Sequence, residues 1–92
     1  MEEIKRIAAT TLTDNEAELY KSTNGAIVKT IALNNTTESN KEVTLKIDGV
    51  TFFIPLQTKE TRFLNSIMLV NNLKGSGNGV NIHVTGIQLG GA

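Results

Sequence analysis

Residues 43–54 read VTLKIDGVTFFI, and this stretch decides the fold. Asp48-Gly49 is typical of a two-residue type I′ turn, and apolar residues alternate on both sides of it. If Ile47 pairs with Val50, two further apolar pairs fall on the same face, Leu45 with Phe52 and Val43 with Ile54. The stretch therefore predicts a β-hairpin with one apolar face.

The opposite face of this hairpin carries Phe53 among polar residues. An aromatic residue there is either a scattered surface residue, which Tyr20 or Phe63 could cover within the chain, or an anchor for another subunit. We therefore take Phe53 as a candidate interface residue. Pro55 ends the second strand or places it at a sheet edge, because proline cannot donate to a ladder.

The rest of the chain also favours β structure. Twelve threonines, nine isoleucines and six valines are β-branched and suit a pleated surface, and ten asparagines and eight glycines supply turns. Alternating or apolar runs predict further strands within the first thirteen residues and at 16–20, 26–33, 61–64, 67–70 and 80–89. A β-bulge at Gly86 accounts for a shift in the last of these patterns. We expect a small antiparallel β-sandwich of about seven or eight short strands, with a small β-barrel as the alternative.

The chain shows no linker or internal repeat, so residues 1–92 are expected to form a single domain, with residues 90–92 as a frayed tail. The N-terminus lacks the cationic start and apolar run of a secretory signal, and no stretch has the roughly 18 to 20 apolar residues that cross a bilayer. These patterns predict a protein that stays in the compartment where it is made.

Composition argues against several classes of function. Nine Lys and Arg balance nine Asp and Glu, which gives no electrostatic reason to bind nucleic acid or an anionic membrane. The absence of cysteine excludes disulfides, thiolate chemistry and zinc sites that use Cys. A short chain leaves little room for a walled pocket, and no catalytic constellation appears. We expect no enzyme activity, no cofactor and no metal.

Two segments are candidate contact loops. Gly75-Ser76-Gly77-Asn78-Gly79 leads into a strand and fits neither the dinucleotide fingerprint nor the P-loop. It predicts a flexible hairpin tip, whose Gly75, Gly77 and Gly79 backbone could settle onto a neighbour. Residues 34–40 read NNTTESN and predict a long, adaptable polar turn. Its candidate interface residues are Asn34, Asn35, Thr36 and Thr37.

The titratable residues that could carry chemistry favour a solvated role. His83 is the single histidine and alternates with apolar neighbours, which predicts an outward-facing strand residue and not a ligand. Asp14, Glu16 and Glu18 share one face if extended. They indicate a solvated edge, because calcium would need more convergent oxygen ligands.

The order of the segments along the chain is also informative. TLT at 11–13 is followed by AELY at 17–20, AIVKTI at 26–31, NNTT at 34–37, VTLKIDG at 43–49 and VNIHVTGI at 80–87. This order resembles small β-sandwich structural proteins of tailed bacteriophages. The resemblance departs from that pattern at Leu73-Lys74-Gly75, where we would expect a Leu-Gly-Asp turn.

The resemblance implies a non-enzymatic virion protein, assembled in the host cytoplasm, that decorates the capsid and braces the particle surface. A neck, collar or tail position is the alternative within the same class. Its implied partners are other virion proteins, together with self-association in the particle. A carbohydrate-binding β-sandwich is a further alternative, although three Phe, one Tyr and no Trp give little material for an aromatic platform.

Overall fold

The computed structural model describes residues 4–65 and 67–89, and in these residues it contains seven antiparallel strands and no helix. The strands are β1 (Ile4–Thr11), β2 (Ala17–Asn35), β3 (Lys41–Ile47), β4 (Val50–Leu56), β5 (Thr61–Leu64), β6 (Met68–Ser76) and β7 (Val80–Gln88). The predicted all-β fold and number of strands are confirmed. The sheet does not close, so the barrel alternative is wrong. The predicted frayed tail at 90–92 lies outside the described residues.

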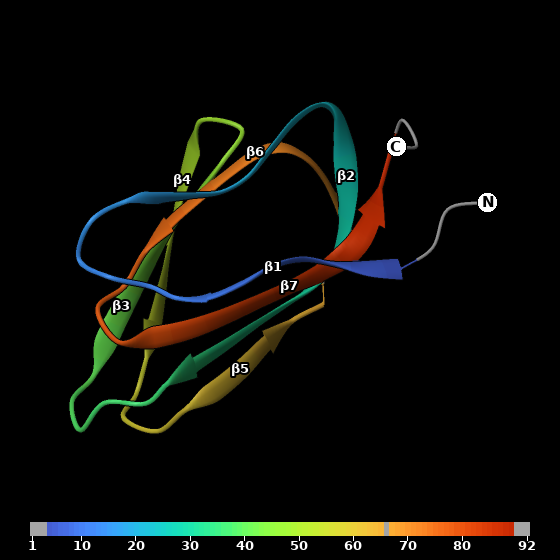
Figure 1. The fold of residues 1–92 in the computed structure, drawn as a ribbon. Helices are drawn as coiled ribbons and strands as arrows, with labels where there is room; N and C mark the ends of the chain where they lie inside the picture. The colour runs from blue at the N-terminus through green and yellow to red at the C-terminus, as the bar shows by residue number, and fades with distance from the viewer. Residues whose placement is uncertain (1–3, 66, 90–92) are drawn as a thin grey trace.

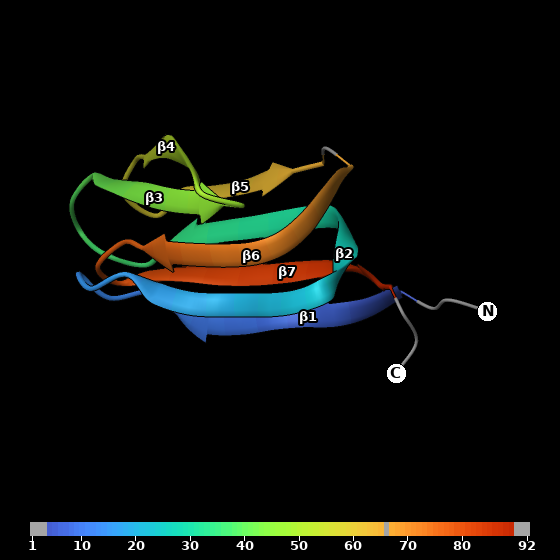
Figure 2. The ribbon, with the colours of Figure 1, turned by 90° about the horizontal axis from the view of Figure 1, so that it is seen from above.

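The strands form one hydrogen-bonded sheet that folds over on itself, in the order β1-β7-β2-β6-β3-β4, with β5 also paired to β2. The first part of β2 pairs with β6, and its last part lies between β7 and β5. One layer therefore contains β1, β7, the end of β2 and β5, while the other contains the start of β2, β6, β3 and β4 (Figure 1). Seen from above, β4 and β5 lie along the same side of the molecule (Figure 2). This arrangement is consistent with a small β-sandwich.

Strand β2 joins two strands that the sequence predicts separately. Its 19 residues take in both 16–20 and 26–33 almost completely, and also Asn34 and Asn35, which were expected in a loop. The register with β6 shifts between Lys21 and Ala26, and Gly25 has a φ of +83°. The strand therefore bends between the layers without ending, because glycine adopts a left-handed conformation at little cost.

The hydrophobic core lies between the two layers. Its fully buried side chains come from every strand except β1 and β5, and from the segment after β1: Leu12, Val28, Ile31, Leu33, Val43, Leu45, Leu56, Val70, Leu73, Val80, Ile82 and Val84. Leu19 is partly buried and packs against this core. Apolar burial of this kind is the main favourable contribution to folding.

The hairpin has the register that the sequence predicts. Ile47 pairs with Val50 across Asp48 and Gly49, whose φ values of 52° and 86° are those of a type I′ turn. The same register places Leu45 opposite Phe52 and Val43 opposite Ile54. The Asp48 carboxylate also accepts hydrogen bonds from the backbone N–H groups of Asn71 and Asn72, at 2.7 and 2.8 Å. The turn is therefore fixed to β6 as well as by its own geometry.

The predicted bulge at Gly86 is wrong in its position. The register shifts occur in the two neighbours of β7, where Ile7 of β1 and Lys29 of β2 are the extra residues. Within β7 the burial alternation continues through Val84 to Gly86. A Cβ atom at Gly86 would clash with the Ile27 carbonyl oxygen, so glycine is needed there for close approach of the β2 backbone.

Candidate functional site

The main candidate site is an apolar groove on the side of the sandwich where β4 and β5 lie, which we call the β4–β5 groove. It has a volume of about 510 Å³. The buried side chains of Ile31 and Leu45 reach it from the core. The remaining lining residues are Ile47, Asp48, Val50, Phe52, Phe53, Ile54, Leu64 and Met68. The groove exists because β4 and β5 are the last strands of their layers on this side and do not pair with each other.

Exposed hydrophobic side chains surround the groove. Phe52 belongs to the inner face of the hairpin, opposite buried Leu45, yet it is 48% exposed, because no further strand covers that side of β4. Val50 beside it is 55% exposed. Phe53, which also lines the groove, is exposed too. An apolar surface of this kind is typical of an interaction site.

Phe53 lies on the outer face of the hairpin, as predicted. It is 64% exposed, so neither Tyr20 nor Phe63 covers it. The Tyr20 hydroxyl instead donates a hydrogen bond to the Gly25 carbonyl, and Phe63 is itself exposed. Phe53 is therefore accessible to another molecule, and its role as an interface residue stays a prediction.

Asn35 is buried, which corrects the expectation of an adaptable contact residue. Its side-chain Nδ2 donates to the carbonyl oxygens of Ser39 and Gln57 at 2.9 and 3.0 Å. Its Oδ1 accepts from the backbone N–H and the hydroxyl of Thr37 at 3.0 and 2.7 Å. A buried polar group is tolerated when it is hydrogen-bonded in this way. Asn35 therefore holds the chain together where β2 ends, and its side chain is not free to contact a partner.

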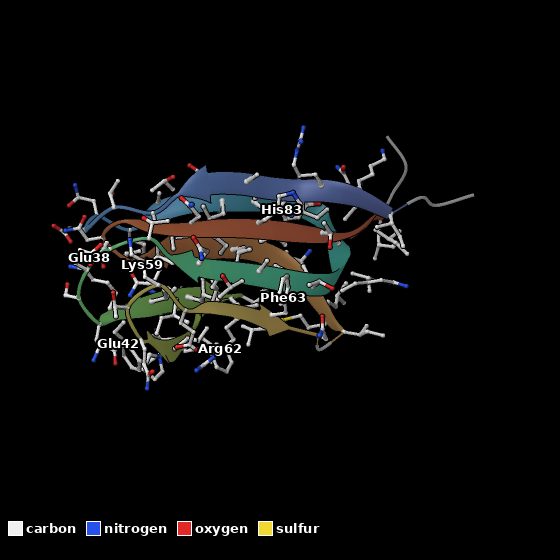
Figure 3. All side chains as sticks on the ribbon, turned by 90° about the horizontal axis from the view of Figure 1, so that it is seen from below. Glu38, Glu42, Lys59, Arg62, Phe63 and His83 are labelled. Atoms are coloured by element: carbon white, nitrogen blue, oxygen red, sulfur yellow. The ribbon has the colours of Figure 1, made fainter. Side chains whose placement is uncertain are left out.

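The neighbouring candidates are tied to other parts of the chain. The Asn34 side chain donates to the Thr61 hydroxyl across the outer face of the sheet. The Thr36 hydroxyl donates to the Gly79 carbonyl, while Thr36 and Thr37 accept from the loop after β4 through their own carbonyls. An exposed ion pair between Lys59 and Glu38 joins the same two loops (Figure 3). We call this end of the molecule the Asn35 corner, comprising residues 34–40 and 57–61.

The glycine-rich segment is not the flexible tip that the sequence predicts. Gly75 and Gly77 are buried, and a Cβ atom on either would contact core side chains, with Leu45 and Val43 each 3.2 Å away. The turn at Gly79 has a φ of +85°, and the N–H groups of Gly77 and Gly79 donate to the carbonyls of Thr13 and Leu12. These glycines therefore allow close packing of β6 and its turn against the segment that follows β1.

A second, shallower depression of about 350 Å³ lies on the outer face of the β1-β7-β2-β5 layer. His83 is exposed there, as predicted, and is paired in the sheet with Ala9 on one side and Ala32 on the other. Phe63 continues the same row beyond Ala32. Figure 3 shows His83 over β7 and Phe63 over β5 on this face. Asn34 with Thr61 and Thr11 with Asn81 form hydrogen-bonded pairs beside them.

The clearest electrostatic perturbation lies at the start of β5. Glu60 accepts a hydrogen bond from the Gln57 backbone N–H at 2.8 Å and forms a 2.7 Å ion pair with Arg62. These two interactions, the backbone hydrogen bond first, hold the pKa of Glu60 below its ordinary value of 4.5. The carboxylate is thus engaged in holding the β4–β5 connection. Within residues 4–65 and 67–89, no three metal-ligating side chains gather, and Asp14, Glu16 and Glu18 are exposed.

Sequence reasoning missed the groove, although it predicted the faces of the hairpin. Alternation shows which residues share a face, but it does not show that β4 is the last strand of its layer. Pro55 did predict a strand end or a sheet edge, and β4 is an edge strand. The signal that was not used is the adjacent pair Phe52 and Phe53, which places a large apolar side chain on each face of that strand.

Neither a comparison with models of protein families nor a search of curated proteins finds a match for the chain. The described part of the chain also contains no helix with the length and apolar character that spanning a membrane would require.

Proposed function

We propose that this chain is a non-enzymatic structural protein of a bacteriophage virion, which decorates the capsid and braces the particle by binding a neighbouring virion protein. The observation that carries the proposal is the β4–β5 groove with its exposed apolar rim. The resemblance noted above supplies the virion setting, and the groove supplies a surface by which such a domain could attach.

The amount of exposed apolar surface supports an assembly role. Monomeric proteins seldom expose contiguous apolar patches of more than a few hundred Å². Here Val50, Phe52 and Phe53, which all line the groove, are each about half exposed or more. Burial against a partner would stabilise both the complex and the fold, since binding to the folded state adds to its stability.

The placement of the titratable residues supports a non-catalytic role. Glu60 is held by Arg62 and the Gln57 N–H in the connection between β4 and β5, whereas His83 lies on β7. His83 has alanine as its sheet neighbour on both sides. General acid–base catalysis needs such groups within hydrogen-bond reach of one reacting atom. The groove itself offers apolar contact and one carboxylate, from Asp48, whose Oδ1 accepts from the β6 backbone.

The test is addition of the purified chain to phage particles assembled without it, followed by co-sedimentation. Stoichiometric binding supports the proposal. A copy number that matches the capsid lattice supports decoration, whereas one that matches a single ring indicates the neck, collar or tail. A folded chain that stays in the supernatant would contradict the virion role.

Two matched variants locate the attachment surface. Val50→Asp places a charge at the groove, at a side chain that is 55% exposed. Ile4→Asp makes the same kind of change in β1, across the sandwich, at a side chain that is 65% exposed. We expect Val50→Asp to weaken co-sedimentation at least tenfold and Ile4→Asp to leave it unchanged. Equal losses would contradict the groove as the attachment surface.

A carbohydrate-binding module is the second candidate function. It is favoured by the outer-face depression, where His83 and Phe63 lie near the Asn34–Thr61 and Thr11–Asn81 pairs, because sugars are recognised by polar groups beside an aromatic ring. A glycan array decides between the two candidates. Glycan binding that is lost in His83→Ala and also in Phe63→Ala would support the carbohydrate-binding module. Binding to no glycan on the array would contradict it.

A further inference from the structure

We infer that one neighbour of this chain is a second copy of itself, and that the two copies pair antiparallel through the free edge of β4. The inference deepens the proposed function and rests on it in one respect, namely that the same side of the molecule serves assembly. The pairing itself is a property of the isolated chain and is tested without any particle.

The free edge of β4 presents the backbone N–H groups of two residues. In a two-residue hairpin the residues that flank the turn form a hydrogen-bonded pair, and such pairs alternate along the ladder. The register Ile47 with Val50 therefore directs the backbone groups of Val50, Phe52 and Ile54 toward β3. Those of Thr51 and Phe53 point outward. The backbone nitrogen of Pro55 also points outward, so the missing N–H of proline removes no hydrogen bond to β3.

This edge also lacks the charged side chains that protect the other edges. Residues 50–56 read VTFFIPL, without a single charge. By contrast, β1 carries Lys5 and Arg6, the start of β2 carries Glu18 and Lys21, and β5 carries Arg62. Charges on edge strands oppose pairing with other chains, so an exposed apolar edge without them is a pairing site.

The partner that fits this edge is β4 itself. In an antiparallel pair centred on Phe52, Thr51 of each copy lies opposite Phe53 of the other. Both residues can donate and accept, so this register gives two complete hydrogen-bonded pairs and satisfies the two outward N–H groups of each copy. A register centred on Phe53 would place Thr51 opposite Pro55, which cannot donate. The contact is isologous, as a two-fold dimer requires.

Side chains favour the same arrangement. The two copies of Phe52 would be direct cross-strand neighbours at the mouths of the two grooves, and each Val50 would lie beside Ile54 of the other copy. The chain has a net charge of zero, so the copies do not repel each other through net charge.

The size of the contact predicts a weak dimer. If a buried aromatic side chain covers about 150–250 Å², the half-exposed Val50, Phe52 and Phe53 offer roughly 300 Å² per copy. Stable complexes bury about 1,200–2,000 Å² in total. We therefore expect dissociation in the micromolar to millimolar range for the isolated chain, a range in which simultaneous attachment to a particle would greatly increase occupancy.

The experiment is sedimentation equilibrium over a concentration series, with two proline variants. Thr51→Pro removes an outward N–H of β4, and Ala9→Pro removes an outward N–H at the edge of β1. The backbone N–H of Ala9 points away from β7. The Leu12 N–H bonds to the Val80 carbonyl, and in an antiparallel pair only every second residue from there directs its backbone groups toward the partner strand. We expect the unmodified chain and Ala9→Pro to dimerise with concentration, and Thr51→Pro to dimerise at least tenfold more weakly. A monomer at all concentrations, or equal weakening by both variants in folded proteins, would overturn the inference.

A cysteine variant tests the register independently. The chain has no cysteine, so Phe52→Cys introduces a single thiol per copy. In the proposed register the two Cα atoms are about 4.5 Å apart, within the range that a disulfide spans. We expect mild oxidation to produce a covalent dimer from Phe52→Cys and little from Phe63→Cys, which is similarly exposed. Cross-linking of both at the same rate would overturn the register. Attachment to particles is measured separately, so pairing can fail while the proposed function holds, and the reverse.

Discussion

The Asn35 corner and the β4–β5 groove are formed by neighbouring parts of the chain. They differ in whether their side chains and backbone groups find partners within the molecule. At the corner, the buried Asn35 amide and the Thr58 hydroxyl join two loops, and among the described residues no buried side-chain polar atom lacks a partner. At the groove, β4 leaves apolar side chains and outward backbone groups uncovered. Both regions contain residues that sequence reasoning took as contacts. Only the groove has uncovered side chains and backbone groups that can bind another molecule.

The largest expected effect is at the corner. Asn35→Leu keeps the branched shape of the side chain but removes both donors and the acceptor, so the partly buried carbonyls of Ser39 and Gln57 and the Thr37 N–H lose their Asn35 partner. We expect a loss of about 3 kcal/mol or more in the free energy of unfolding, measured by urea denaturation. Asn34→Leu is the control, because its side chain makes one hydrogen bond on the outer face, and should cost about 1 kcal/mol. Similar losses in the two variants would contradict the special role of the buried Asn35 side chain.

The next effect separates two residues that are paired in the hairpin. Leu45 is fully buried and Phe52 is 48% exposed, although they lie opposite each other on one face. We expect Leu45→Ala to cost about 2–4 kcal/mol and Phe52→Ala about 1 kcal/mol, measured in dilute solution where the chain is monomeric. If Phe52→Ala cost as much as Leu45→Ala, the groove would be closed in solution.

These residues also show how much of the structure can be predicted from the sequence. The turn at Asp48-Gly49 and the alternation around it fix the register of the hairpin, because both are local properties. The environment of Asn35 includes Ser39 of its own turn, but it depends also on Gln57, which a distant segment brings to it. Likewise, the glycines at 75 and 77 are spacers only because Leu12, Val43 and Leu45 pack against them. Local pattern therefore predicts faces and turns, and not which polar residue the fold will enclose.

A smaller effect on stability is expected at the outer face of the hairpin. Phe53→Asp replaces a side chain that is 64% exposed, so the denaturation midpoint should change by less than about 0.5 kcal/mol equivalent. The same variant should weaken both self-association and attachment to particles, because it places a charge on the uncharged edge of β4. A fall of several kcal/mol would instead mean that Phe53 is buried in the folded monomer.

The smallest effect is expected at Glu60, which lies where the corner meets the β5 wall of the groove. Its pKa is lowered in the folded state by the Gln57 N–H and by Arg62, relative to an ordinary value of 4.5. A carboxyl group of this kind stabilises the fold above its unfolded pKa, and that contribution is lost as the pH falls through the folded value. Glu60→Gln should therefore be less stable than the unmodified chain at pH 7, and the difference should shrink as the pH falls below 4.5. Urea midpoints across that range measure it, with Glu42→Gln at an exposed position of β3 as a control for removing one charge (Figure 3). A difference that is constant with pH would mean that the loss at Glu60 comes from packing, and that the carboxylate charge does not hold the β4–β5 connection.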